Sequence, residues 1–142
     1  MRFFSNSDKK DAANQLPKGY TFDKKDEIKE DGEIILKNNE KYLLLIDGKY
    51  FPHLKSLPKE QYKGVYVDRG ALPFITKGAD LMRPGIRSFD ESFEKDEIVF
   101  IGDEQTKKVV ALGIALFNST DMKAIEKGKV VKVVHFVGDK RY

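Results

Sequence analysis

The stretch from Val67 to Ile86, VDRGALPFITKGADLMRPGI, is rich in glycine and proline, and it constrains the fold more than any other part of the chain. A short apolar run from Val65 to Val67 ends at Asp68-Arg69-Gly70, which predicts a strand that leaves through a turn. Pro73 then falls in the first turn of a predicted helix over residues 71–77. Its missing N–H costs no hydrogen bond at that position.

Two Gly-Ala pairs bracket this predicted helix, Gly70-Ala71 before it and Gly78-Ala79 after it. Gly78 follows a lysine and is free to adopt positive φ, which is typical of a helix end. The chain resumes through Leu81-Met82 and stops again at Pro84-Gly85. Small residues at both ends of a short helix let the backbone approach either another segment of the protein or a ligand.

The pattern G-A-x(6)-G-A-x-L-M-x-P-G-I, preceded by Val67-Asp68, resembles the core of a PUA domain. Apolar strands around Gly113 and Gly128 extend the resemblance, which runs from about Lys63 to Tyr142. The resemblance implies a small β-barrel module of the kind found in proteins that handle tRNA and rRNA. It predicts a PUA domain over residues 63–142.

The first part of the chain resembles an extra N-terminal domain that one branch of this family carries. The residues that carry this likeness are Tyr50-Phe51-Pro52 and Leu54. The branch comprises small archaeal PUA proteins and the malignant T-cell amplified sequence family, whose members partner the density-regulated re-initiation factor. We therefore expect a small pre-PUA domain over residues 1–62.

The N-terminal part reads as one helix followed by a meander of strands. Possible N-caps precede a helix over residues 8–16, and the charged run from Asp23 to Asp31 indicates a solvated edge strand or a loop. Strands are expected over residues 33–37, 41–46 and 49–51. Asn38-Asn39 and Asp47-Gly48 connect them, and Asp-Gly is a strong hairpin signal. Residues 52–64 form the expected connector.

The C-terminal part alternates short strands with turns. The acidic segment 87–97 reads as a solvated loop, and strands follow over residues 98–101 and 109–117, with Gly113 marking a bend or bulge. Ser119 and Thr120 are candidate caps of a short helix that reaches Glu126 and stops at Lys127-Gly128. A strand over 130–137 closes the sequence. The expected fold class is α+β, mainly β: a PUA-type pseudo-barrel with two short helices, preceded by a small α+β meander domain.

Composition excludes several classes of protein. The 142 residues contain no cysteine and only two histidines, His53 and His135, so neither a disulfide framework nor a metal site is indicated. No apolar run approaches the roughly 20 residues of a membrane span, and we expect a cytoplasmic protein. The net charge of +3 permits nucleic-acid binding without demanding it.

The leading hypothesis, implied by the PUA resemblance, is a non-catalytic RNA-binding protein in translation or tRNA and rRNA handling. In the family, RNA runs across the short helix and the following strand. The candidate RNA-binding residues are therefore Arg69, Gly70, Ala71, Lys77, Gly78, Ala79, Arg83, Pro84 and Gly85. Arg69 and Lys77 read equally well as ordinary surface charges. The expected partner is structured RNA, with no DNA, membrane, metal or cofactor.

Two other hypotheses come from different classes. The chain could be a protein-interaction subunit that docks a translation or RNA-modification partner, or the small ribosomal subunit, and contacts RNA only in the assembly. An exposed apolar patch at Tyr50, Phe51 or Leu54 would favour that reading. An enzyme is disfavoured, because the first 60 or so residues lack a nucleophile with a base, a phosphate-binding loop and metal-ligand spacing.

Overall fold

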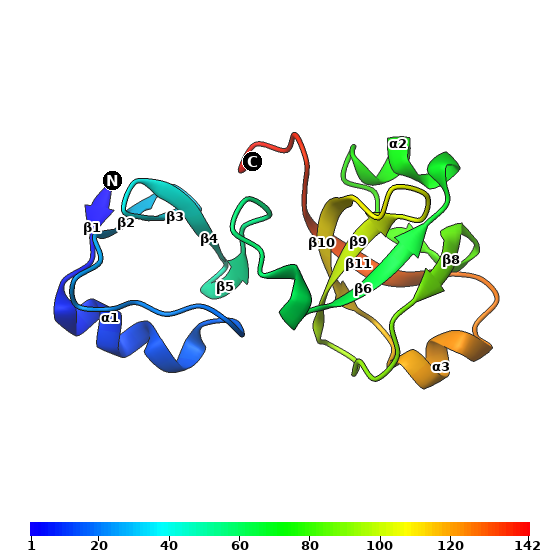
Figure 1. The fold of residues 1–142 in the computed structure, drawn as a ribbon, viewed down its shortest axis with the longest axis horizontal. Helices are drawn as coiled ribbons and strands as arrows, with labels where there is room; N and C mark the ends of the chain where they lie inside the picture. Colours follow the sequence, from blue (N-terminus) through cyan, green and yellow to red (C-terminus); the bar gives the residue numbers. More distant parts are fainter. The chain divides into compact units, whose positions relative to one another are not determined.

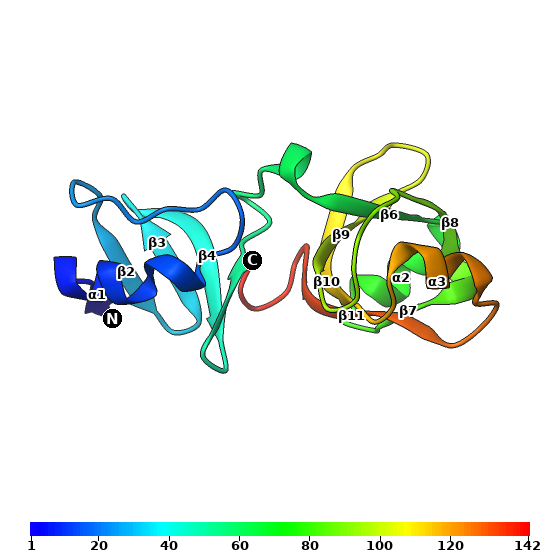
Figure 2. The same cartoon turned by 90° about the horizontal axis from the view of Figure 1, so that it is seen from below.

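The computed structural model describes all 142 residues, and they form two compact units (Figures 1 and 2). The first unit comprises Met1–Gln61 together with Arg141, and the second comprises Tyr62–Lys140 together with Tyr142. That residues 1–62 and 63–142 are separate domains, each able to fold by itself, stays a prediction.

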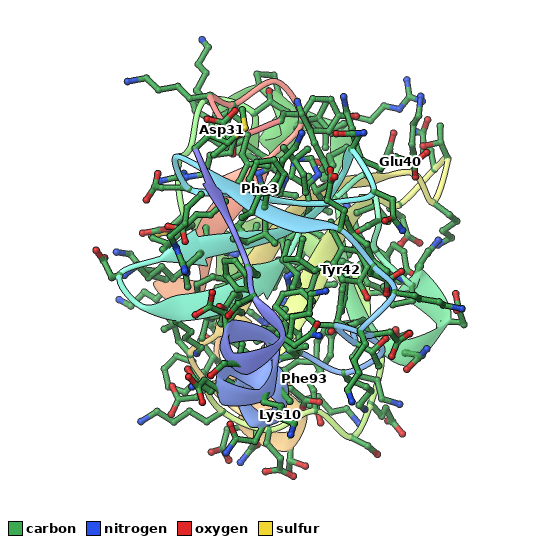
Figure 3. All side chains as sticks on the ribbon, turned by 90° about the vertical axis from the view of Figure 1, so that its left-hand side faces the viewer. Phe3, Lys10, Asp31, Glu40, Tyr42 and Phe93 are labelled. Atoms are coloured by element: carbon green, nitrogen blue, oxygen red, sulfur yellow. The ribbon has the colours of Figure 1, made fainter.

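The first unit is a five-stranded antiparallel sheet with one helix on its face. In Figure 3, Lys10 marks helix α1 and Tyr42 marks strand β4 of the sheet. The strands lie in the order β1-β2-β3-β4-β5. The elements are β1 (Arg2–Phe3), α1 (Asn6–Ala12), η1 (Ala13–Gln15), β2 (Ile28–Asp31), β3 (Ile34–Lys37), β4 (Glu40–Ile46), β5 (Lys49–Pro52) and η2 (Lys59–Gln61). Its core consists of Phe4, Ala12, Tyr20, Ile28, Ile35, Leu43 and Tyr50.

Local sequence explains the ends of these elements. Ser5 and Asp8 form a reciprocal capping box at the start of α1, in which each side chain accepts a hydrogen bond from the other's backbone N–H. Both predicted hairpin connections are confirmed. Asn38-Asn39 have φ of 51° and 69° and Asp47-Gly48 have 50° and 77°, the positive pairs that two-residue hairpin turns require.

The charged run 23–31 differs from its prediction as an edge strand or loop. Its second half is strand β2, which lies inside the sheet between β1 and β3. Ile28, the run's only aliphatic residue, is 1% exposed and belongs to the core. The two-residue strand β1 pairs with β2 and removes it from the edge, and such a short strand leaves no periodic signal in a sequence.

The second unit is a six-stranded sheet in the order β7-β11-β10-β9-β6-β8. Strands β6 and β9 run parallel, and the other neighbours are antiparallel. The elements are β6 (Lys63–Val67), η3 (Arg69–Ala71), α2 (Leu72–Ile75), β7 (Leu81–Met82), η4 (Arg83–Gly85), β8 (Ile86–Phe89), β9 (Ile98–Asp103), β10 (Val109–Ala115), α3 (Ser119–Ala124) and β11 (Lys129–Phe136).

The connection between β7 and β8 requires this sheet to curl. These strands are the two edges of the sheet, and only the three residues of η4 separate them in sequence. A flat sheet of six strands would hold its edges about 24 Å apart, whereas the chain from Met82 to Ile86 spans at most about 14 Å. The sheet therefore closes on itself into the predicted pseudo-barrel, with η4 as its seam.

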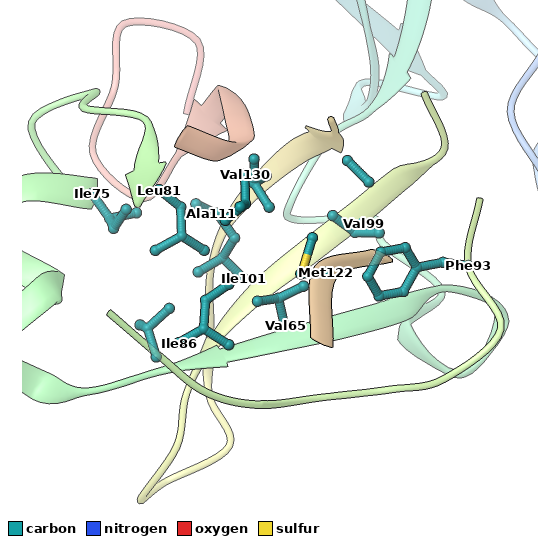
Figure 4. Close-up of a cluster of buried hydrophobic side chains, with 13 residues drawn as sticks. Val65, Ile75, Leu81, Ile86, Phe93, Val99, Ile101, Ala111, Met122 and Val130 are labelled. Carbon is teal, nitrogen blue, oxygen red and sulfur yellow. The ribbon is translucent and has the colours of Figure 1, made fainter. Parts of the chain in front are cut away.

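The barrel interior holds one hydrophobic cluster, shown in Figure 4. Ile75 from α2, Leu81 from β7 and Ile86 from β8 lie next to one another in it, so the core includes both sides of the seam. Helices α2 and α3 lie on opposite sides of the strands (Figure 1). The predicted irregularity at Gly113 is confirmed by a register shift between Leu112 and Gly113.

Two predictions in this unit are wrong in detail. The segment 87–97 is not all solvated loop, since Arg87–Phe89 belong to strand β8 and Phe93 is 1% exposed. Helix α3 is capped by Asn118, whose side chain accepts from the Asp121 N–H, and not by Ser119 or Thr120; it ends at Ala124. The longest helix of the whole structure has seven residues, so no helix could cross a membrane.

Candidate nucleic-acid interface

An open pocket of about 420 Å³ lies at the barrel seam. Five of the predicted RNA-binding residues line it: Gly70, Ala71, Ala79, Pro84 and Gly85. The other lining residues are Asp68, Phe74, Ile75, Asp80, Leu81 and Met82. The two Gly-Ala pairs and the Pro-Gly stop, which are separated in sequence, therefore meet around one cavity.

The backbone at the end of α2 builds one side of this pocket. Gly78 has φ of 92°, its N–H donates to the carbonyl of Ile75, and the N–H of Ala79 donates to the carbonyl of Phe74. This pair of hydrogen bonds is a Schellman motif with glycine at C′. The predicted helix stop is thus confirmed, and it turns Ala79 and the following chain back toward the pocket.

On the other side of the pocket, Gly85 lets two segments of the chain pack closely together. A Cβ added there would lie 3.3 Å from the Cβ of Ala71 and 3.6 Å from a Leu81 methyl carbon. The seam segment η4 and the turn η3 therefore approach each other through small residues. The sequence left open whether these small residues approach another segment of the protein or a ligand. At Gly85 they approach another segment, and the pocket lies beside this contact.

Two exposed apolar side chains form part of the pocket wall. Phe74 is 65% exposed and Met82 is 49% exposed, although the neighbouring residues Ile75 and Leu81 are buried in the core. An exposed aromatic ring beside a hollow offers a stacking surface for a planar ligand. The candidate residues predicted from the sequence did not include Phe74 or Met82. The sequence held one sign that Phe74 is exposed. Phe74 and Ile75 are adjacent on a short helix, and such a helix cannot bury two adjacent side chains on the same face.

The pocket also contains two carboxylates in different situations. Asp80 is engaged through both oxygens, because Oδ1 accepts from the Val133 N–H at 2.9 Å and Oδ2 pairs with Lys129 at 2.9 Å. Burial alone would raise the pKa of Asp80, but these two partners outweigh it and hold the pKa below its ordinary value. Asp68 is 49% exposed, and its only side-chain partner is Arg87, at 3.4 Å.

The three predicted cations do not line the pocket. Arg69 is exposed and pairs with Asp103 at 3.7 Å. The Gln105 N–H is the main cause that holds the pKa of Asp103 below its ordinary value, so Arg69 is a secondary partner of that carboxylate. Lys77 is exposed and makes no ion pair.

Arg83 has a structural role instead. Its Nε donates to the Met122 carbonyl at 3.0 Å, and its guanidinium lies 5.6 Å from the centre of the Phe89 ring. Only Lys77 among the predicted cations has a side chain that is both exposed and uncommitted. Gly78, the remaining predicted residue, acts through the helix end described above.

Further acidic side chains and a further cavity lie elsewhere in the molecule. No group of three or more histidine, cysteine or acidic residues could hold a metal ion. In the acidic segment, Asp90 accepts the Gly64 N–H and Glu97 accepts the Glu94 N–H, so both carboxylates stabilise local backbone. A second open cavity, of about 660 Å³, lies in the first unit and is lined by Lys37, Asn38, Glu40, Lys41, Tyr42, Lys55 and Ser56.

The apolar patch that would favour a protein-docking subunit is not exposed. Tyr50 and Phe51 are 8% and 5% exposed, and Tyr50 belongs to the core of the first unit. Leu54 is half-buried. Tyr50 and Phe51 therefore offer no free apolar surface.

Residues 63–137 match the PUA domain family, and the chain belongs to that family. It is 44% identical over 117 residues to an uncharacterized protein of Methanocaldococcus jannaschii, in a match that covers 80% of this chain and 71% of that protein. It is 34% identical over 96 residues to translation machinery-associated protein 20 of Saccharomyces cerevisiae, covering 62% of this chain and 53% of the yeast protein. A malignant T-cell-amplified sequence 1 homolog of Drosophila melanogaster is 32% identical over 98 residues, covering 66% and 54%.

The chain spans about half the length of these eukaryotic relatives. Among solved structures, it resembles a hypothetical protein of Pyrococcus horikoshii, with a TM-score of 0.77, 32% identity and coverage of 98% and 95%. It resembles a PUA domain of Aeropyrum pernix with a TM-score of 0.81, 25% identity and coverage of 98% and 86%. A structure of H/ACA RNP bound to a substrate RNA matches 66% of this chain and 28% of its own, with a TM-score of 0.55 and 28% identity. The predicted kinship with archaeal PUA proteins and the malignant T-cell amplified sequence family is confirmed.

Proposed function

We propose that this chain is a non-catalytic RNA-binding protein that acts in translation or in tRNA and rRNA handling. In this proposal an unpaired base of a structured RNA enters the pocket at the barrel seam and stacks on Phe74. The observation that carries it is the exposed Phe74 ring beside a cavity lined by the predicted small residues. Sequence-specific RNA recognition commonly uses unstacked bases held against aromatic side chains.

The composition of the pocket favours a base over a phosphate. Its walls are apolar side chains, small residues and two carboxylates, and no lysine or arginine lines it. A phosphate there would meet like charge, whereas a base would meet an aromatic ring and hydrogen-bond acceptors. The phosphates would instead follow the outside of α2, where Lys77 is exposed.

We assign the nine predicted residues different parts in this function. The small residues Gly70, Ala71, Ala79, Pro84 and Gly85 would leave room for the base, and Gly78 would hold the helix end in place. Lys77 would contact a phosphate directly. Arg69 would do so by leaving its long, exposed ion pair, and Arg83 would act by holding the seam.

The relatives support the cellular setting. The name of the yeast relative associates that protein with the translation machinery, and one solved structure that this chain resembles holds a substrate RNA. The partner we propose is tRNA or rRNA with an unpaired segment, with the small ribosomal subunit or a translation factor as the platform. Such a role needs no cofactor and no DNA, and it belongs to the cytoplasm.

The proposal is tested by comparing two exposed phenylalanines. The full chain is titrated with tRNA and with single-stranded oligonucleotides at low salt, as wild type, Phe74→Ala and Phe3→Ala. Phe3 is 60% exposed on strand β1 of the first unit and serves as the matched control. Loss of one base-stacking contact weakens binding by about 1 to 3 kcal/mol, which we expect for Phe74→Ala alone.

Equal affinity of both variants and wild type would refute the base pocket. Failure of the folded wild-type chain to bind any RNA at low salt would favour the other reading, a protein-interaction subunit that meets RNA only within an assembly. Thermal unfolding of each variant shows that an affinity change does not come from loss of structure.

A further inference from the structure

Asp68 occupies a helix-capping position without acting as a cap. It precedes η3 with an extended backbone, at φ of −66° and ψ of 147°, but its side chain accepts no hydrogen bond from the η3 backbone. Aspartate at such a position normally accepts one from an N–H in the first turn. The local backbone therefore does not explain where this carboxylate is directed.

The Arg87 ion pair does not explain it either. The two side chains are 49% and 62% exposed and lie 3.4 Å apart, and pairs this open to water contribute little to stability. Asp80, on the same pocket, shows the contrast, because each of its oxygens has a partner at 2.9 Å. Of the two carboxylates that line the pocket, Asp68 is the one with acceptor capacity to spare.

An ionised carboxylate accepts hydrogen bonds and donates none. A carboxylate beside an aromatic stacking surface distinguishes bases by the hydrogen-bond donors on their edges. Guanine presents two adjacent donors, N1–H and the N2 amino group, which match the two oxygens of a carboxylate. Adenine and cytosine each present one amino group, whereas the single N–H of uracil lies between two carbonyl oxygens that a carboxylate repels.

We propose that Asp68 selects the base that enters the pocket, favouring guanine most and uracil least. This inference rests on the proposed function, since it concerns a base stacked on Phe74. Phe74 supplies affinity that every base shares, and Asp68 supplies the difference between bases. Arg87 pairs with only one of the two carboxylate oxygens, at 3.4 Å, so the other oxygen has no side-chain partner.

The test uses four RNA heptamers. Each has six uridines and a central base that is guanine, adenine, cytosine or uracil, so that the heptamers differ at one site only. Wild type is expected to bind the guanine heptamer roughly fivefold to 150-fold more tightly than the all-uridine one. Asp68→Asn can both donate and accept, so it should reduce that ratio at least about fivefold by gaining uracil binding. Arg87→Ala retains the carboxylate and should keep the preference.

Removing a negative charge raises affinity for any RNA, so the guanine-to-uracil ratio, and not affinity itself, is the readout. Asp47→Asn is the matched control, because it makes the same charge change in a hairpin turn of the first unit, at a positive φ that asparagine tolerates. It should leave the ratio unchanged.

The outcomes separate the two proposals. If Phe74→Ala weakens binding of all four heptamers but wild type shows no preference, or Asp68→Asn retains the preference, the selecting role of Asp68 is overturned and the base pocket stands. If Phe74→Ala leaves every affinity unchanged, the base pocket itself is overturned. A preference that falls equally in Asp68→Asn and Asp47→Asn would assign the effect to overall charge and reject the inference.

Discussion

Gly78 lies against the ring of Phe136, so that a Cβ added at position 78 would come within 3.2 Å of the ring carbon Cε1. Helix α2 and the last strand of the barrel thus meet where the helix ends. Two requirements coincide at this glycine, a backbone with φ of 92° and a close neighbour.

Gly78→Val should therefore lower the stability of the second unit. Strain from a β-branched residue at positive φ is worth about 1 to 3 kcal/mol, and the contact with Phe136 adds to it. Gly128→Val separates the two causes, since Gly128 has φ of 95° and open space around it. Chemical denaturation should show a loss in both variants and a larger loss for Gly78→Val. Unchanged stability of Gly78→Val would contradict the Schellman motif.

A fragment of residues 62–142 should fold without the first unit. The hydrophobic cluster of the barrel lies wholly between Val65 and Phe136, so its core needs no residue from the N-terminal part. Cooperative thermal unfolding of this fragment, with the spectrum of a β-rich protein, is the expected result. A fragment that unfolds gradually or remains unfolded would show that residues 1–62 and 63–142 share one folding unit.

Asp80 should make stability depend on pH in the acid range. Burial works against its ionised form, but Lys129 and the Val133 N–H hold its pKa below the ordinary value of 3.8. A group with a lowered pKa in the folded state stabilises above its unfolded value, and that stability is lost as pH falls through the folded pKa. Asp80→Asn should be less stable than wild type at pH 7, with a difference that shrinks below about pH 3.8.

Urea midpoints of wild type and Asp80→Asn at pH 7 and pH 3 measure this difference. Asp11→Asn is the control, because Asp11 is an exposed carboxylate on α1 that forms no ion pair. If the difference in urea midpoint between wild type and Asp80→Asn stays constant with pH, the ion pair with Lys129 and the hydrogen bond from the Val133 N–H do not favour the ionised form of Asp80.

Local chemistry made much of the fold predictable. The helix stop at Gly78 and the hairpin turns at Asn38-Asn39 and Asp47-Gly48 depend on a few adjacent residues, and the structure has each where the sequence predicts it. Strand β2 was misjudged because its burial depends on pairing with β1, which lies far away in sequence.

For the candidate site, too, the sequence predicted the local features but not the contacts between distant segments. The small residues predict that the backbone comes close to another group, and five of them line one pocket. The exposure of Phe74 and the bond from Arg83 to the Met122 carbonyl arise only when the sheet closes and brings distant segments together. No spacing in the sequence distinguishes Arg83 from Lys77, although the structure gives them different roles.

Lys77→Ala and Arg83→Ala should accordingly behave differently. Lys77 is exposed and unpaired, so its loss should leave thermal stability unchanged and flatten the slope of log K against log salt by about 0.7 for a single-stranded RNA. Arg83→Ala removes the charged donor to the Met122 carbonyl, which keeps only the Ile125 N–H at 3.3 Å. The lost hydrogen bond should lower stability by about 1.5 to 3 kcal/mol, the range for hydrogen bonds that involve a charged group. Salt titrations of tRNA binding and thermal unfolding of both variants separate the two effects. A wild-type salt slope in folded Lys77→Ala would place the phosphate contacts elsewhere, and the exposed lysines Lys127, Lys129 and Lys132 would be the next to replace.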